Sequence, residues 1–191
     1  MEIALDIARG IGNASARERA LATIAAAQAE SGDVAGALET VQAIEDENRR
    51  SNTRANIART QVAAADLSGA LATAGAIETP SWETDWGLGT RFVEKLLEMA
   101  IGAGGVTRAS VLLDIAKAQI ASGDAAGARA TLARAFEDAK LIENKYGLFN
   151  TLLDVVLSQA ASGDLAGARR MAESAGLTPA IPWPALEAKA R

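Results

Sequence analysis

The chain repeats itself with a period of 33 residues, and this repetition constrains the fold more than any other feature of the sequence. In the first two copies, Gln28 is matched by Gln61 and Asp33 by Asp66. The four copies occupy residues 20–46, 53–79, 110–136 and 150–176. A unit of this length cannot bury an apolar face alone, so successive units have to stack on one another. The repetition therefore predicts an array of stacked units.

Each copy is typical of a helix, a tight turn and a second helix. Apolar residues with helical spacing lead to Ser31-Gly32-Asp33, and the same three residues recur at 122–124 and 162–164. Gly32 suits the left-handed residue that follows a helix, and Asp33 suits the N-cap of the next helix. We therefore interpret the repeated aspartates as turn residues, and their repetition argues against a unique catalytic carboxylate.

The turn and the start of the second helix carry a family resemblance. A small residue recurs at one position of each second helix; these residues are Ala37, Ala70, Ala128 and Ala168. This pattern resembles the tetratricopeptide family over residues 16–78 and 108–176. Glutamine stands where that family prefers an aromatic residue, alanine or valine where it prefers glycine, and the closing proline is absent. We expect the glutamines to be structural and to bond neighbouring backbone groups.

The resemblance implies an all-α fold, either a tetratricopeptide-like α-solenoid or a helical bundle of antiparallel helix pairs. We expect one domain over residues 1–191, with an inserted helix after the second full repeat. Its predicted parts are a partial repeat (2–13), repeats at 16–48 and 49–79, an insertion (80–105), repeats at 106–145 and 146–176, and a tail (177–191). Asp124 and Asp164 are 40 residues apart, and the seven extra residues are about two helical turns, enough to lengthen the helices.

The insertion contains the loop-like run Trp82 to Trp86, followed by an amphipathic helix over 91–101 that carries Phe92 and Leu96. One interpretation is a degenerate repeat that covers the core between the two halves of the chain. The other is a lid or hinge over a pocket, with glycines for mobility and the two tryptophans at its opening.

The resemblance also implies which residues line the concave groove. Small and apolar residues predominate there, and Arg59 and Lys117 are its central charges. The groove residues that we predict to bind a ligand are Ala55, Arg59, Val62, Leu113, Lys117, Ile120, Leu153 and Leu157, together with Trp82, Trp86, Phe92 and Leu96 of the insertion. A long apolar groove left in water is unusual for a monomer, so an apolar occupant is expected.

Two functional hypotheses follow. The first is a carrier of a hydrophobic ligand such as a lipid or sterol, since the general build is similar to that of bacterial helical-repeat sterol-transport proteins. The alternative is a protein-interaction scaffold that docks a partner helix or peptide in the groove. Catalysis is a weaker hypothesis, because no serine, lysine or carboxylate has the spacing of a nucleophile and its base.

Composition excludes several classes of protein. The chain has no cysteine and no histidine, which rules out disulfides, zinc fingers and histidine-dependent catalytic triads. A net charge of −5 without a basic block argues against a nucleic-acid partner. No apolar run is long enough to span a bilayer. We expect no cofactor, no metal and no enzymatic activity.

The compartment is weakly indicated. The lack of cysteine suits the periplasm, and the cytoplasm is the alternative. Residues 2–13 look like the second helix of a repeat whose first helix is missing, so either the array is capped in this way or the sequence is trimmed from a longer protein, and we favour the second interpretation. That leaves room for a leader or a membrane anchor before the first residue.

Overall fold

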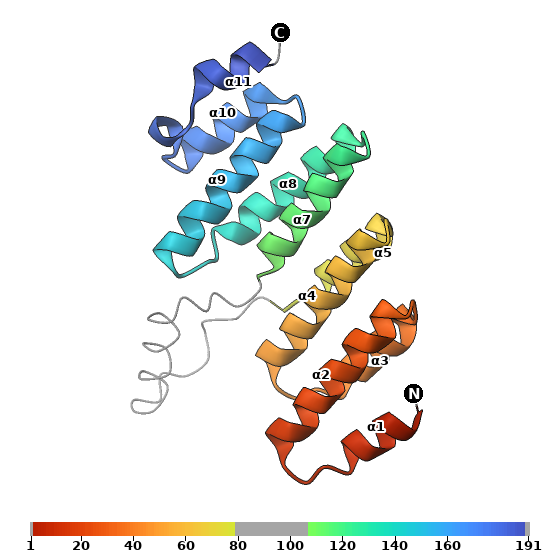
Figure 1. The fold of residues 1–191 in the computed structure, drawn as a ribbon. Coiled ribbons are helices and arrows are strands. Elements are labelled where there is room, and N and C mark those ends of the chain that lie inside the picture. Colours follow the sequence, from red (N-terminus) through yellow and green to blue (C-terminus); the bar gives the residue numbers. More distant parts are fainter. Residues whose placement is uncertain (1, 79–106, 190–191) are drawn as a thin grey trace, which may run out of the picture.

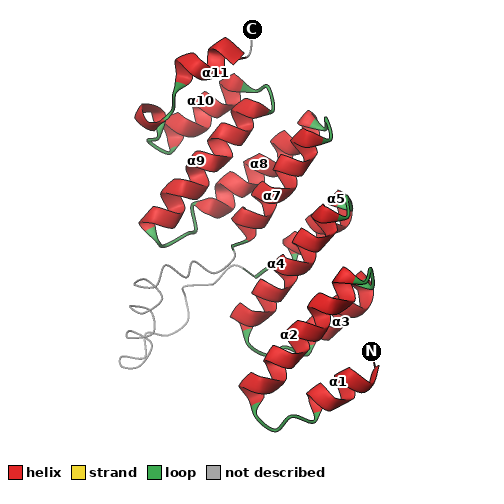
Figure 2. Cartoon of the chain, viewed as in Figure 1, coloured by secondary structure: helices red, strands yellow, loops and turns green. Residues whose placement is uncertain are grey.

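The computed structural model describes residues 2–78 and 107–189, which form ten α-helices, one short 3₁₀ helix and no strand (Figure 2). The helices before the insertion are α1 (Glu2–Arg9), α2 (Ala14–Glu30), α3 (Val34–Gln42), α4 (Glu47–Ala63) and α5 (Leu67–Gly75). Those after it are α7 (Arg108–Ala121), α8 (Ala125–Ala139), α9 (Lys145–Ala161), α10 (Leu165–Ser174), η1 (Thr178–Ala180) and α11 (Trp183–Lys189). The predicted insertion, 80–105, lies outside the described residues.

The helices form an array of antiparallel pairs, which confirms the all-α prediction. The first helices, α2, α4, α7 and α9, contact one another in sequence and form one layer. The second helices, α3, α5 and α8, each pack against their own first helix and the next one. Figure 1 shows the pairs stacked along one direction, with the two termini at opposite ends. The first-helix layer is therefore a continuous face, called here the inner face.

A hydrogen-bonded corner joins the two helices of each pair. In the first copy, Gly32 has a φ of 89°, and the backbone N–H of Asp33 donates to the carbonyl of Gln28 at 2.8 Å. This pattern is the Schellman motif, in which a left-handed residue lets the chain close the helix end. Asp33 then accepts from the backbone N–H of Gly36 at 2.9 Å and caps α3. The predicted turn chemistry of the aspartates is thus observed.

The corner glutamine holds this aspartate from the other side. Gln61 Nε2 donates to Asp66 Oδ2 at 3.0 Å, and the hydroxyl of Thr73 donates to Gln61 Oε1 at 2.7 Å. The expectation that the glutamines bond backbone groups is wrong, because Gln28 and Gln61 reach both the aspartate carboxylate and a threonine hydroxyl of the second helix, and Gln159 reaches its aspartate. The Oε1 atoms of Gln119 and Gln159 are buried without a hydrogen-bond partner among the described residues. The hydrogen bond from the Gly69 N–H, followed by that from Gln61, lowers the pKa of Asp66 and favours its charged form.

The corner also explains why glycine stands three residues after each aspartate. A Cβ on Gly69 would lie 2.0 Å from Asp66 Oδ2 and 2.2 Å from Gln61 Nε2, far inside contact distance. A Cβ on the equivalent glycine of the other copies, Gly36, Gly127 or Gly167, would lie 2.0–2.3 Å from Oδ2 of its own aspartate. The absent side chain is therefore a packing requirement of the corner.

Arginines join one repeat to the next. Arg17 donates to the carbonyl of Ile11 at 3.3 Å, and Arg50, 33 residues later, donates to that of Ile44 at 2.9 Å. Arg50 also forms a two-bond ion pair with Glu78, and Arg54 donates to the same carboxylate at 3.1 Å. The bonds to Ile11 and Ile44 fix the ends of α1 and α3 against the start of the next first helix, and the bonds to Glu78 fix α4 against the segment that follows its own second helix, α5.

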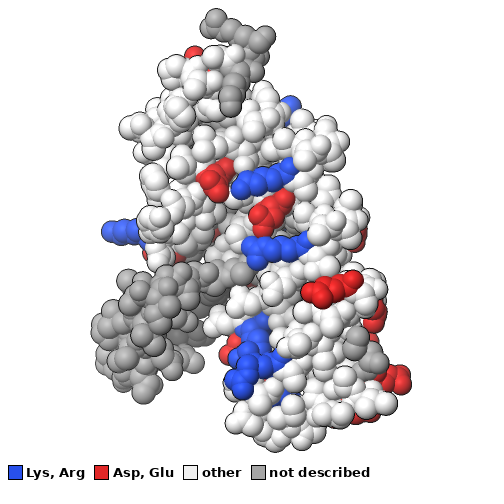
Figure 3. Space-filling model, viewed as in Figure 1, with Lys and Arg blue, Asp and Glu red and all other residues white. Residues whose placement is uncertain are grey.

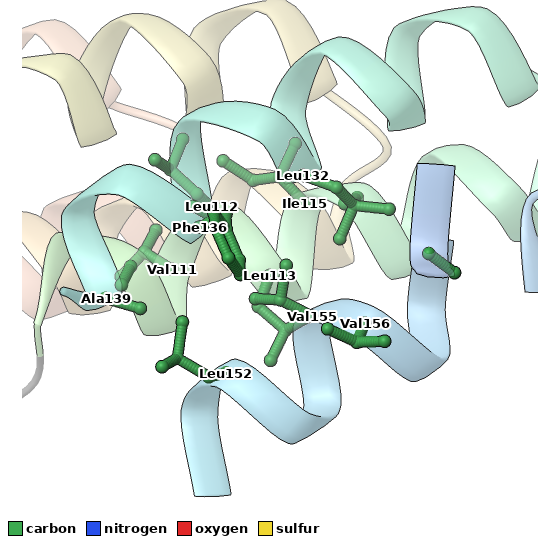
Figure 4. Close-up of a cluster of buried hydrophobic side chains, with 14 of the residues drawn as sticks. Val111, Leu112, Leu113, Ile115, Leu132, Phe136, Ala139, Leu152, Val155 and Val156 are labelled. Carbon is green, nitrogen blue, oxygen red and sulfur yellow. The ribbon is translucent and has the colours of Figure 1, made fainter. Parts of the chain in front are cut away.

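The largest apolar cluster of the described residues extends from α4 and α5 through the second half of the molecule. Side chains from α7, α8 and α9 interdigitate there, as Figure 4 shows for Leu112, Ile115, Leu132 and Val155, which are all fully buried. The tail joins this cluster through Trp183, whose ring lies under Arg169 and whose Nε1 donates to the Thr178 carbonyl at 3.2 Å. The tail thus covers the end of the array.

The helix bounds add detail to the predicted repeats. α4 begins at Glu47 and α9 at Lys145, close to the expected repeat starts. α8 has 15 residues where α3 and α5 have nine, so the longer spacing between the third and fourth copies lengthens the second helix, as expected. Ile3 and Ile7 of α1 are exposed. They stand 33 residues before Gly36 and Thr40, which lie on the side of α3 that packs against its first helix, α2.

Replacing Gly69 by alanine tests the corner. We expect Gly69→Ala to lower the free energy of unfolding by about 2 kcal/mol, because the new Cβ displaces the cap and its glutamine partner. Gly75→Ala is the matched control, since a Cβ there meets no atom within 4 Å. Urea midpoints of the two variants measure the difference. Equal midpoints would contradict this account of the glycine.

The corner of the second copy allows a substitution that should stabilise the protein. Ala65 occupies the left-handed position there with a φ of 60°, where the three other copies have glycine. We expect Ala65→Gly to raise the free energy of unfolding by about 0.5–1 kcal/mol, as relief of strain exceeds the added chain entropy. Gly32→Ala should lower it by a similar amount. Urea unfolding checks both, and a loss of stability in Ala65→Gly would overturn the interpretation.

Candidate functional site

The predicted groove residues lie on the inner face, but they differ in accessibility. Ala55 and Leu113 are buried, 0% and 6% exposed, and belong to the core. Four others are half-buried and pack against that core; these are Val62, Ile120, Leu153 and Leu157. Trp82, Trp86, Phe92 and Leu96 lie outside the described residues. The described apolar groove residues therefore belong to the part of the core that lies directly beneath the inner face.

The two central charges of the face are paired. Arg59 of α4 binds Asp114 of α7, with Nε at 2.9 Å from Oδ2, and Lys117 of α7 lies 3.7 Å from Asp154 of α9. Each pair thus joins one first helix to the next, and we call the two pairs the ion-pair row. Figure 3 shows positive and negative side chains alternating across α4, α7 and α9. In this structure the charge of Arg59 is directed at Asp114.

The register of the corners explains the ion-pair row. Arg59 and Lys117 stand two residues before their corner glutamines, and Asp114 and Asp154 stand five residues before theirs. A cation of one repeat therefore meets an anion of the next. In the first two repeats the corresponding positions hold Ala26 and Asn56, so the row does not extend to α2.

A polar hollow occupies the inner face where the ion-pair row stops. It has a volume of about 330 Å³ and lies between α2 and α4. Its lining residues are Ala22, Asp46, Asn48, Arg49, Asn52, Thr53 and Asn56. Another hollow of about 270 Å³ lies along α1, beside Glu2, Leu5, Asp6 and Arg9. The inner-face hollow is the candidate site because it lies on the continuous surface that the repeats build.

Small side chains on α2 make room for this hollow. Ala22 stands six residues before its corner glutamine, and the third and fourth repeats have Leu113 and Leu153 at that position. Two residues before the glutamine, the first repeat has Ala26 where the third has Lys117. The face is therefore filled in the second half of the molecule and hollowed in the first.

Three asparagines line the hollow at helical spacing. Asn48, Asn52 and Asn56 are four residues apart on α4, so they lie along one side of that helix. Within the described part of the chain, no hydrogen bond occupies their side-chain amides, and Asn48 and Asn56 are exposed. We call these three residues the asparagine row. Each offers one acceptor and two donor hydrogens to a ligand.

The two charged residues of the hollow differ in their contacts, because Asp46 is held by hydrogen bonds and the Arg49 side chain only by the charge of Glu18. Asp46 caps α4 by accepting from the Arg49 backbone N–H at 2.7 Å, and its own N–H donates to Glu18 at 3.2 Å. The Arg49 guanidinium lies 3.5 Å from Glu18. The positive and negative charges at this end of the hollow therefore offset each other. The buried Nε of Arg49 has no hydrogen-bond partner among the described residues, so the guanidinium N–H groups of Arg49 and the neutral asparagine amides are left as the available chemistry of the hollow.

None of the three asparagines is among the residues predicted from the sequence to bind a ligand. The available signal was the i, i+4, i+8 spacing of asparagines in a helix otherwise rich in arginine. In residues 2–78 and 107–189, no group of three acidic residues could hold a metal ion. None of the helices described has the length and apolar character needed to cross a membrane.

Comparison of the chain with protein-family models, with curated proteins and with solved structures gave no significant match. The functional argument therefore rests on the geometry of the inner face.

A double-mutant cycle tests the ion-pair row. We expect Arg59→Ala and Asp114→Ala to show a coupling energy of about 0.3–1 kcal/mol in urea unfolding, because the pair is only partly shielded from water. The coupling should fall in about 1 M salt, where screening is strong. The more exposed pair Arg9–Asp6 is the control and should show none. Absence of coupling at low salt would contradict the assigned pairing.

Proposed function

We propose that this protein is a non-catalytic interaction module that docks a segment of a partner polypeptide on its inner face. The observation that carries the proposal is the hollow between α2 and α4, lined by three asparagine amides that no other described residue engages. This proposal corresponds to the scaffold hypothesis. Under this proposal the partner contacts the first half of the inner face, at the hollow between α2 and α4.

Amide chemistry favours a polypeptide over a hydrocarbon ligand in this hollow. A lipid chain that covered Asn48, Asn52 and Asn56 would remove their amides from water without offering hydrogen bonds, at a cost of about 1–3 kcal/mol for each unpaired group. A peptide offers a donor and an acceptor at every non-proline residue. The same contacts that cost a lipid affinity would therefore be satisfied by a peptide.

The remainder of the inner face is also polar on its surface. The ion-pair row next to the hollow continues the polar surface over α7 and α9. Charged side chains that are paired and partly exposed resemble the polar rim of a protein interface more than the lining of a lipid cavity. The described surface thus supports a polypeptide partner.

The carrier hypothesis remains a separate prediction. Half-buried apolar residues such as Leu153 and Leu157 do lie on the inner face. Four of the twelve residues predicted to bind a hydrophobic ligand lie outside the described residues. A carrier would hold its ligand on these half-buried apolar residues and not on the asparagine row.

Selection from a random peptide library tests the proposed function. We expect peptides that bind the full chain with micromolar affinity, and we expect Ala22→Leu to weaken binding at least about tenfold by filling the hollow. The fold should accept this change, because leucine occupies the equivalent position in the third and fourth repeats. Ala27→Leu on the exposed side of α2 is the control and should leave the dissociation constant unchanged.

Two results would contradict the proposal. One is a selection that enriches no peptide above the bare support. The other is a set of peptides whose binding is equally strong in Ala22→Leu. A lipid from a total extract that stays bound in native mass spectrometry and is lost in Leu157→Glu would favour the carrier hypothesis instead.

A further inference from the structure

The asparagine row has a spacing that identifies the conformation of its ligand. Along an α-helix, residues four apart are separated by about 6.0 Å. In an extended strand, residues two apart are separated by about 6.4–6.8 Å. These two spacings are similar, so consecutive asparagines of α4 can face alternate residues of an extended chain that lies beside the helix.

The hydrogen-bonding groups agree as well as the distances. In an extended chain, the N–H and C=O of one residue point to the same side, and those of the residue two further on point there again. A side-chain amide can accept from that N–H through Oδ1 and donate to that C=O through Nδ2. Asn48, Asn52 and Asn56 could therefore each bond one of three alternate residues.

A helical ligand does not satisfy the row in this way. The backbone groups in the middle of a helix already bond one another, so they offer nothing to an asparagine amide. A ligand of a single sign of charge is not favoured either, because the positive charge of Arg49 and the negative charges of Asp46 and Glu18 occur together at this end of the hollow. The available chemistry of the hollow is complementary to free peptide groups.

We infer that the asparagine row binds a partner segment in extended conformation, through the backbone groups of alternate residues. This inference rests on the proposed function, and it adds the conformation of the ligand and the atoms that hold it. Asn52 lies at the centre of the row, whereas each neighbouring asparagine is rotated by about 40° around the helix axis. Asn52 therefore makes the best-aligned contact.

Backbone methylation of a selected peptide tests the inference. A methyl group on a backbone nitrogen removes one N–H and leaves the side chains unchanged. Scanned along the peptide, methylation should weaken binding about tenfold at two or three alternate positions and less than about twofold at the positions between them. Equal sensitivity at consecutive positions, sensitivity three to four residues apart, or no sensitivity would overturn the inference.

Variants of the protein complete the test. Asn52→Ala should weaken binding of the same peptide about tenfold and reduce the methylation effect at one position of the peptide. Asn150→Ala is the matched control, because Asn150 stands in the same register in α9 and is exposed. It should leave the affinity unchanged. Unchanged affinity in Asn52→Ala would also overturn the inference.

The two levels of the proposal fail in different ways. If selected peptides lose affinity in Ala22→Leu but show no alternate sensitivity to methylation, the hollow binds peptides and the extended backbone contact is wrong. If no peptide is selected, the proposed function fails, and the inference fails with it.

Discussion

The hydrogen-bonded corner between paired helices is the interaction on which the remaining structure depends. A corner aspartate caps the second helix, a glutamine of the first helix reaches that aspartate in three of the four copies, and a glycine leaves room for both, as seen at Gln61, Asp66 and Gly69. Because the aspartate cap and the glycine recur in each copy, every pair leaves its corner with a similar geometry. The first helices can then stack into one layer, and positions counted back from the corner glutamine face the same side in every repeat.

That constant register turns small sequence changes into surface chemistry. Two residues before the corner glutamine, the chain has Ala26, Arg59, Lys117 and Leu157 in successive repeats. The two cations find acceptors five residues before the next glutamine and form the ion-pair row. Where the cation is replaced by Ala26, the partner position is Asn56, and the hollow opens with unpaired amides along it. The same repeated backbone thus carries paired charges in the second half of the inner face and a hollow with unpaired amides in the first half.

The sequence predicted much of this fold, because its signals are local. The turn at Ser31-Gly32-Asp33, the lengthened spacing before Asp164 and the cap role of the aspartates all depend on residues close in the chain. The partners of Arg59 and Lys117 could not be predicted in the same way, since Asp114 and Asp154 belong to neighbouring repeats and meet them only at the observed packing of the first helices. The polar hollow was missed for a related reason. Its existence depends on the small size of Ala22 on the facing helix as much as on the asparagines themselves.

The central claim is that a polypeptide segment binds in the hollow of the inner face as an extended chain. A crystal structure of the protein with a selected peptide tests it most directly. We predict an extended peptide beside α4, with both polar atoms of the Asn52 amide on the backbone of one peptide residue and the Arg59–Asp114 pair intact. A peptide bound as a helix, or one seated on another face with the asparagine row unoccupied, would contradict the account.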